Sequence, residues 1–214
     1  MFNDITGAIF DLDGTLVNSM WVWEKIDKNY FDYLGIPIPS NLKDEINHLS
    51  FEQTASYFKN RFNIQASIEE IINKWNDMAL YEYSNNVLLK DGAFDFIKKL
   101  KNNNIKIGLA TSNSNILLEA ALKNNNIYHY FDSITTSSEV KKSKDNPDIY
   151  LLAAKKLGVS PNNCIVFEDI IQGVKGAKLA GMKVVAVYDN YSKHQENDLI
   201  KIADKYIKSY TELM

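Results

Sequence analysis

The chain has 214 residues, of which 45% are hydrophobic and 24% are charged, as in an ordinary globular protein. Its formal net charge of −3 gives no whole-protein basis for nucleic-acid binding, and no apolar stretch is long enough to span a bilayer. Cys164 is the single cysteine, so an internal disulfide is excluded. We therefore expect a cytoplasmic protein with no nucleic-acid partner and no membrane partner.

An apolar run over residues 5–10 predicts a buried strand, and the sequence DLDGT at 11–15 follows it directly. Open α/β sheets bind ligands at the carboxyl ends of their strands, which is where Asp11 and Asp13 are expected. Two such carboxylates can hold a divalent metal, and one can attack an electrophile while the other handles a proton. The same residues also occur in ordinary strand-ending turns, because Asp and Gly favour turns.

Residues 17–87 show helical periodicity and no strand pattern. A helical insertion after the first strand lies above the carboxyl edge of the sheet. It is either a packing decoration or a lid that excludes water and selects the substrate, and we favour the lid. The first predicted helix ends at Gly35, and a short helix is predicted over 42–49. The capping boxes Ser50/Gln53 and Ser67/Glu70 predict the starts of two further helices.

From residue 91 onward, short apolar strands alternate with helices, which predicts a parallel sheet covered on both faces. We expect an α/β fold: a doubly wound, Rossmann-like parallel sheet core, residues 1–16 and 88–214, with an inserted all-helical cap domain, residues 17–87. The predicted strands cover 105–110, 133–136, 164–167, 183–187 and 206–208, and the predicted helices cover 91–103, 115–123, 147–157, 170–180 and 199–203.

Three further strand ends carry groups suited to phosphoryl transfer. Thr111 ends one strand, Lys144 follows the next, and Glu168 with Asp169 ends a third. In a doubly wound sheet these ends meet near Asp11. Carboxylates are hard ligands for magnesium, and a lysine and a hydroxyl can neutralise and hold a phosphoryl group. Asp13, close to a like charge, would be pushed toward its protonated form.

Each of these groups alone also has an ordinary explanation. Lys144 ends the basic run over 141–144, which is typical of a solvated surface. Thr111 could simply end a strand, and Glu168 with Asp169 could cap a helix. Four independent strand ends that each carry the required group favour the functional interpretation.

Together these residues resemble the haloacid dehalogenase superfamily of phosphatases and phosphomutases, in particular its β-phosphoglucomutase-like phosphatases. The resemblance spans the whole chain, and the helical insertion resembles the first type of cap in this superfamily. The segments that carry it are DLDGT at 11–15, LATSN at 109–113, SKDNPDIY at 143–150 and VFEDIIQGVKGAKLAGM at 166–182.

The resemblance implies catalytic roles for Asp11, Asp13, Thr111 and Lys144. Asp11 would be the nucleophile that becomes an aspartyl phosphate, and Asp13 the general acid/base. Thr111 would bind the phosphoryl group, and Lys144 would neutralise it and orient Asp11. Magnesium would be held by Asp11, the backbone carbonyl of Asp13, Asp169, and Glu168 either directly or through water.

Two departures from the family pattern bear on the reaction. Asp145 follows Lys144 where the family commonly has proline, so its carboxylate either weakens the local positive potential or points to solvent. By ungapped counting, Trp23 and Phe51 stand where mutase relatives have a cap histidine and a cap arginine for a second phosphate. We therefore expect hydrolysis rather than mutase activity.

The predicted function is a magnesium-dependent phosphatase, a monomer or weak homodimer, that acts on a small phosphorylated metabolite such as a sugar phosphate. A β-phosphoglucomutase is the alternative within the same class, and a non-catalytic phosphometabolite sensor is the alternative from another class. Dehalogenation is disfavoured, because dehalogenases lack the second aspartate. The predicted substrate-binding residues are Gly14, Ser112, Asn113, Asn18, Trp23 and Phe51. Further candidates for the cleft are Trp21, Glu24 and His48. Aromatic residues at helical spacing are, however, more often buried in a core.

Overall fold

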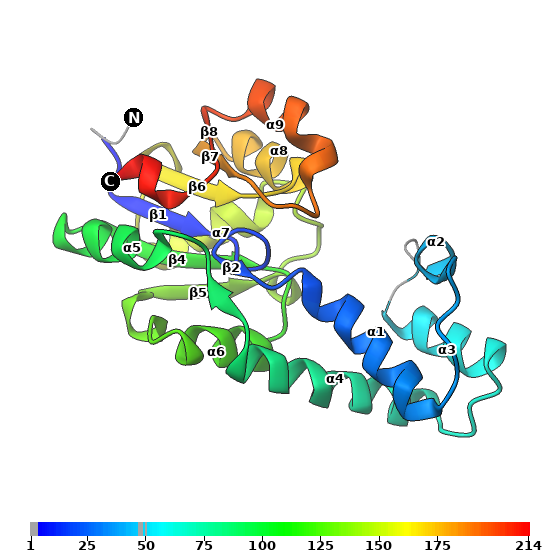
Figure 1. The fold of residues 1–214 in the computed structure, drawn as a ribbon. Coiled ribbons are helices and arrows are strands. Elements are labelled where there is room, and N and C mark those ends of the chain that lie inside the picture. Colours follow the sequence, from blue (N-terminus) through cyan, green and yellow to red (C-terminus); the bar gives the residue numbers. More distant parts are fainter. Residues whose placement is uncertain (1–3, 47–48, 50) are drawn as a thin grey trace.

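The computed structural model describes residues 4–46, 49 and 51–214 (Figure 1). In these ranges a six-stranded sheet and a separate two-stranded ladder are surrounded by helices. The strands are β1 (Gly7–Phe10), β2 (Val17–Asn18), β3 (Leu88–Leu89), β4 (Lys106–Thr111), β5 (Ser133–Thr136), β6 (Cys164–Glu168), β7 (Lys183–Val187) and β8 (Lys205–Ile207). The helices are α1 (Trp21–Leu34), α2 (Leu42–Ile46), α3 (Phe51–Arg61), α4 (Ile68–Asn85), α5 (Ala93–Asn102), α6 (Asn115–Asn124), α7 (Asp148–Leu157), α8 (Ile171–Leu179) and α9 (Glu196–Ile202).

The large sheet has the strand order β5-β4-β1-β6-β7-β8, and all neighbouring strands in it are parallel. The chain builds outward from β1 through β4 to β5, and then crosses back to place β6 on the other side of β1. The strand order therefore reverses at β1. In open α/β sheets a ligand crevice forms outside the carboxyl ends at such a reversal, and Asp11 stands directly after β1.

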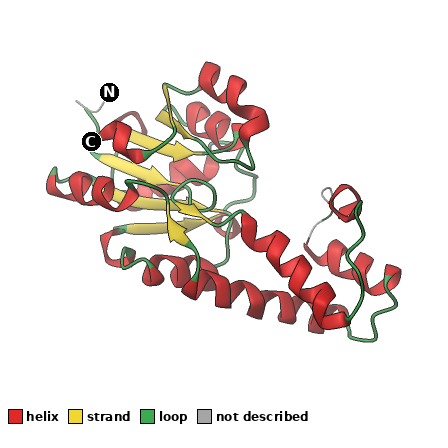
Figure 2. Ribbon diagram, in the orientation of Figure 1, coloured by secondary structure: helices red, strands yellow, loops and turns green. Residues whose placement is uncertain are grey.

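Both faces of the sheet are covered, as Figure 2 shows. Alternate residues of β1 point to opposite faces, so Ala8 and Phe10 belong to one apolar cluster and Ile9 to the other. The first cluster contains the inner side chains of α5 and α6, and the second contains those of α7, α8 and α9. This double burial explains why the central strands β1, β6 and β7 are mostly apolar, and the predicted α/β fold is confirmed.

Helices α1 to α4 lie between β2 and β3 in the chain, and α1, α2 and α3 project away from the sheet (Figure 1). Aromatic rings form their core: the Phe58 ring centroid lies 5.0 Å from that of Trp75 and 5.3 Å from that of Phe31. The capping box at the start of α4 is confirmed, because the Ser67 hydroxyl accepts from the Glu70 amide and the Glu70 carboxylate accepts from the Ser67 amide. Helix α4 then runs back to pack along α6.

Two details of the inserted segment differ from the prediction. Val17 and Asn18 form an antiparallel ladder with Leu89 and Leu88, so the segment is not helical at its very start. A ladder of two residues is too short to produce an alternating pattern in the sequence. Helix α2 is described over Leu42–Ile46, and Leu49, the predicted end of that helix, lies in a bend. The predicted capping residue Ser50 and the cleft candidate His48 lie outside the described residues.

The remaining elements agree with their predicted positions to within a few residues. Gly35 and Gly158 take the left-handed conformation at the ends of α1 and α7, with φ of 67° and 66°. None of the helices that the structure describes has the length and apolar character needed to traverse a bilayer.

Candidate active site

The centre of the site is an ion-paired lysine at the carboxyl edge of the sheet. The Lys144 Nζ donates to Asp11 Oδ1 at 2.5 Å and to Glu168 Oε1 at 2.6 Å. The Tyr150 hydroxyl also donates to Glu168 Oε1, at 2.9 Å. All four side chains are buried, at most 8% exposed for Lys144. Residues that are separated by more than 130 positions in the chain thus meet at the strand reversal, as predicted.

A third carboxylate, that of Asp169, completes the cluster. Asp169 follows β6, and its Oδ1 accepts a hydrogen bond from the Thr15 hydroxyl at 2.9 Å. Gly14, at a φ of 77°, leaves room for this carboxylate: a Cβ at that position would lie 2.5 Å from Asp169 Oδ2. Ligand oxygens of Asp11, Glu168 and Asp169 all lie within 4.8 Å of one another. Three buried carboxylates that face a single lysine are a donor set suited to a hard divalent cation.

The electrostatics of this cluster reflect crowded negative charge. Burial raises the pKa of Asp169 well above its usual range, and the charges of Asp11 and Glu168 raise it further. Burial likewise raises the pKa of Glu168, although the Lys144 charge opposes that rise. Burial by itself would lower the pKa of Lys144, but the charges of Asp11 and Glu168 outweigh it and hold that pKa above its ordinary value. A bound cation would relieve the same repulsion.

Asp13 lies apart from this cluster and has its own set of donors. Its Oδ1 accepts from the Ser19 hydroxyl at 2.6 Å and from the Tyr83 hydroxyl at 2.5 Å, and its Oδ2 accepts from the Asn113 amide at 2.8 Å. Burial raises the pKa of Asp13 and the charge of Asp11 adds to the rise, while the three hydrogen bonds oppose it. The net direction is the one expected for a carboxyl that must carry a proton.

The end of β4 presents hydroxyl groups beside Asp13. The buried Thr111 hydroxyl accepts from the Asn113 backbone amide at 3.0 Å, which leaves its proton for another acceptor. Ser112 is exposed, and its hydroxyl lies 2.9 Å from that of Ser137. A small anion could therefore be held at this strand end by a hydroxyl and the neighbouring backbone amides.

The loop that carries Lys144 packs closely against helix α8. A Cβ at Gly176 would lie 2.0 Å from the Lys144 carbonyl oxygen, and one at Gly173 would lie 2.2 Å from the Glu168 carboxyl carbon. Both positions therefore require glycine. The Asp145 carboxylate points away from the cluster, because it accepts from the Ser143 hydroxyl and the Asn146 amide of its own loop. Of the two expectations for Asp145, the solvent-facing one is confirmed.

The predicted cap residues lie in a different environment from the acid cluster. The rings of Trp23 and Phe51 meet edge to face at 5.5 Å, and Phe51 also contacts Trp75 at 5.4 Å. Trp23, Phe51 and Trp75 line a cavity of about 210 Å³ whose walls all come from the helical insertion. Asn18 is exposed in β2, and its carbonyl accepts from the Trp21 indole.

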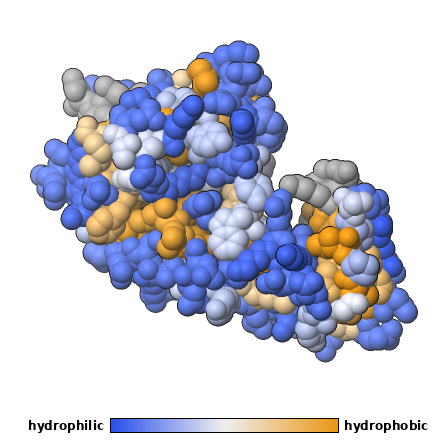
Figure 3. Space-filling view, viewed as in Figure 1, coloured by the Kyte–Doolittle hydropathy of each residue, from blue (hydrophilic) through white to orange (hydrophobic). Residues whose placement is uncertain are grey.

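A larger cavity of about 690 Å³ lies where the insertion meets the core, and the space-filling view shows a hollow between these two parts (Figure 3). Its walls are mainly apolar residues of α1, α2 and their connection, and Tyr191 from the loop after β7 closes one side. The Tyr191 hydroxyl donates to Glu24 at 2.9 Å, which links this loop to α1. The charged residues in the described lining are Glu24 and Asp27.

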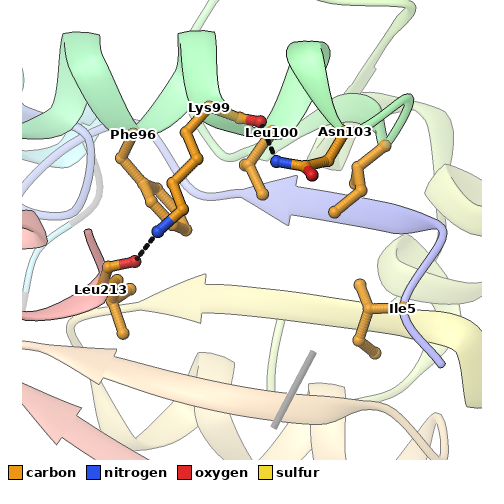
Figure 4. Close-up of a pocket in the computed structure, with 7 residues that line it drawn as sticks. Ile5, Phe96, Lys99, Leu100, Asn103 and Leu213 are labelled. Atoms are coloured by element: carbon orange, nitrogen blue, oxygen red, sulfur yellow. Dashed lines mark hydrogen bonds between the residues drawn. The ribbon is translucent and has the colours of Figure 1, made fainter. Parts of the chain in front are cut away.

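Another cavity, of about 460 Å³, lies at the opposite edge of the sheet (Figure 4). Ile5, just before β1, and residues of α5 line it, and the Lys99 ammonium donates to the Leu213 carbonyl at 3.0 Å. No carboxylate is among its described lining residues. It has none of the groups that the predicted chemistry requires.

Four side chains that touch the site were not predicted from the sequence, and one of them, Ser19, lies just before α1. Thr15 was within the recognised motif but had no assigned partner, and Tyr150 lies in the segment 143–150. Tyr83, in contrast, lies in no motif: it is 70 positions from Asp13, near the end of α4. Only the three-dimensional arrangement brings it to Asp13.

The comparisons with known proteins agree with this geometry. A family model for haloacid dehalogenase-like hydrolases matches residues 8–187. Hexitol phosphatase B of Escherichia coli is 27% identical over 98% of this chain and 94% of its own length. A phosphorylated carbohydrates phosphatase of Thermotoga maritima is 27% identical over 82% of each chain. The crystal structure of β-phosphoglucomutase from Clostridium difficile has a TM-score of 0.72 at 26% identity and covers 98% of this chain and 93% of that one.

The fold and the buried acid cluster define a hydrolase built on a doubly wound sheet. The chain belongs to the haloacid dehalogenase-like hydrolase family. The predicted enzyme class, a phosphoric monoester hydrolase, is confirmed by the phosphatases among its relatives.

Proposed function

We propose that the protein is a magnesium-dependent phosphatase that hydrolyses a phosphate monoester of a sugar or related small metabolite through an aspartyl phosphate. The observation that carries the proposal is the division of labour among the carboxylates. Asp11 is ion-paired with Lys144 inside the acid cluster, whereas Asp13 is held outside it by three neutral donors. The printed names of the relatives, hexitol phosphatase and phosphorylated carbohydrates phosphatase, support the substrate class.

In the first half-reaction, the Asp11 carboxylate attacks phosphorus and the bond from phosphorus to the ester oxygen breaks. Asp13 gives its proton to that oxygen, and the alcohol leaves. In the second half-reaction, Asp13 takes a proton from water while the water oxygen attacks phosphorus. Phosphate departs and Asp11 is regenerated. Proton transfer of this kind contributes about 10²- to 10⁴-fold to a rate.

The charge on the transferred group is balanced by the surrounding residues. Lys144 orients Asp11 and neutralises phosphoryl oxygens, and the Thr111 hydroxyl donates to one of them. Magnesium would be held by Asp11, the backbone carbonyl of Asp13, Asp169, and Glu168 either directly or through water, and it would supply further positive charge. Gly14 lets the backbone approach the phosphate, and Ser112 and Asn113 stand at the same edge.

We also propose a core of residues 1–16 and 88–214 and a cap of residues 17–87. We favour hydrolysis over mutase activity, in which a phosphoryl group moves between two positions of a sugar through a bisphosphate. The charged residues in the described lining of the two cavities that Trp23 lines, Glu24 and Asp27, are both acidic, and they would repel a second phosphate there. The aromatic pair of Trp23 and Phe51 likewise offers no cation for it.

Phosphate release from a panel of phosphorylated metabolites, with Mg²⁺ and with EDTA, tests the proposal. We expect metal-dependent release from one or a few sugar phosphates. Conversion of a sugar phosphate into its isomer, dependent on an added sugar bisphosphate and without net phosphate release, would favour a mutase instead. Binding of a metabolite without release, in the folded protein, would favour a sensor.

A further inference from the structure

The carboxylate of Asp13 is fixed by donors from three parts of the chain. Ser19 belongs to the segment between β2 and α1, Tyr83 to α4, and Asn113 to the loop after β4. Ser19 and Tyr83 are each 1% exposed, so solvent does not compete strongly for their hydroxyls. The Asn113 amide is also fixed, because its oxygen accepts from the Ser114 backbone amide at 2.7 Å.

The two carboxylate oxygens of Asp13 accept different sets of hydrogen bonds. Oδ1 accepts from two hydroxyls, at 2.6 Å and 2.5 Å, whereas Oδ2 accepts from one amide at 2.8 Å. Each carboxylate oxygen has two lone-pair sites. Ser19 and Tyr83 therefore occupy Oδ1, and Oδ2 keeps a site for exchange with a substrate oxygen or water.

The position of the Tyr83 hydroxyl is set by packing. Helix α4 packs along α6, and the Tyr83 ring is buried among core residues. The hydroxyl therefore has a fixed place from which to hold Asp13, 70 positions earlier in the chain.

We propose that Tyr83 is a positioning residue for the acid/base: by holding Oδ1 of Asp13, it directs Oδ2 toward the leaving oxygen. The inference rests on the proposed phosphatase function and adds to it a residue that lies outside the family segments. Tyr83 itself donates no proton to the substrate and acts only through Asp13.

Leaving groups of different basicity separate this role from a merely structural one. An alkyl oxygen leaves poorly unless it is protonated, whereas p-nitrophenolate leaves readily without a proton. The value of kcat/KM includes every step through formation of the phosphoenzyme. A misplaced Asp13 should therefore lower kcat/KM for an alkyl phosphate more than for p-nitrophenyl phosphate.

The experiment compares Tyr83→Phe with the unaltered protein on p-nitrophenyl phosphate and on the sugar phosphate that the panel shows to be hydrolysed fastest. We expect kcat/KM to fall about tenfold more for the sugar phosphate than for the aryl ester. Tyr81→Phe is the matched control, since Tyr81 lies on the same helix and is 63% exposed. This control should change kcat/KM for neither ester. Ser19→Ala removes the other donor to Oδ1 and should show the same selective loss.

Equal losses on both esters, or no loss on either, would overturn the role of Tyr83 while leaving the phosphatase intact. If Tyr83→Phe fails to fold, Ser19→Ala tests the premise of the proposal: absence of the selective loss in that variant would contradict the idea that holding Oδ1 directs Oδ2 toward the leaving oxygen. Failure of the unaltered protein to hydrolyse any ester would instead contradict the proposed function itself, so the two failures are distinguishable.

Discussion

The carboxyl edge of the sheet and the helical insertion are stabilised in opposite ways. At the sheet edge, buried charges meet: Lys144 lies between Asp11 and Glu168, with Asp169 beside them. In the insertion, aromatic rings pack around Trp75. The first arrangement costs desolvation energy that only a specific set of partners offsets, whereas the second gains energy from any well-packed apolar side chains. The chemistry is thus restricted to few residues, and the shape of the insertion depends on many.

The largest test of this contrast removes the nucleophile. Asp11→Asn should lower kcat by at least about 10³-fold, because an amide cannot take the place of the attacking carboxylate. The fold should remain, since the change reduces repulsion with Glu168 and Asp169. Steady-state kinetics and thermal melting measure the two effects. Asp145→Asn, which alters an exposed carboxylate next to Lys144, should leave kcat nearly unchanged; retained activity in Asp11→Asn would contradict the assignment.

Substitution of Lys144 should show how much its charge contributes to the free energy of unfolding. Without Lys144, the buried carboxylates of Asp11 and Glu168 lose their common cation, and we expect a loss of about 3–5 kcal/mol in the free energy of unfolding for Lys144→Gln. Urea denaturation in EDTA measures it. Lys142→Gln is the matched control: its exposed ammonium lies 3.9 Å from Asp148, so its removal should cost under about 1 kcal/mol. Similar losses for both variants would mean that the buried pair contributes no more than a surface pair.

Metal should stabilise the edge and leave the insertion unaffected. A cation bound to the native state at a concentration 100 times its Kd adds about 2.7 kcal/mol to the free energy of unfolding. We expect Mg²⁺ to raise the melting temperature relative to EDTA, and Asp169→Asn to abolish that rise. An undiminished response in Asp169→Asn would place the cation elsewhere.

The smallest predicted effect tests the insertion. Burial, with a contribution from the Glu24 charge, raises the pKa of Asp27 from 3.8 to about 6. Because the folded pKa is the higher one, the proton stabilises the fold fully below about pH 3.8, and this stabilisation is lost as the pH rises through about 6. Asp27→Asn should therefore be more stable than the unaltered protein by about 1–2 kcal/mol at neutral pH, after allowance for partial exposure.

A pH series of urea denaturation curves measures this difference, which should shrink as the pH falls from about 6 and vanish below about 3.8, where Asp27 is neutral in both the folded and the unfolded state. A difference that does not depend on pH would show that packing, rather than charge, is responsible.

Most of the sheet edge could be predicted from sequence because Asp11, Thr111, Glu168 and Asp169 stand at or directly after the ends of largely apolar strands. Asp11, Thr111 and Glu168 are placed by the strands before them, and the parallel order then brings them together. The two-residue ladder of β2 and β3 could not be predicted, since it has no periodicity of its own. Tyr83 could not be predicted either, because an isolated tyrosine on a helix resembles any core aromatic until its hydroxyl is seen to reach Asp13.

The ladder between β2 and β3 has an evolutionary consequence. Because Val17 pairs with Leu89, the chain leaves the sheet layer and returns to it at adjacent points, so an insert of another length can be joined there with little change in loop-closure entropy. Exchange of the insert between relatives would then behave like replacement of a module. Such an exchange would change more than the surface that recognises the substrate, however, because Tyr83 is part of the insert. Each transplanted insert must supply its own anchor for Asp13, and recombination at this junction is therefore constrained by proton transfer as well as by substrate fit.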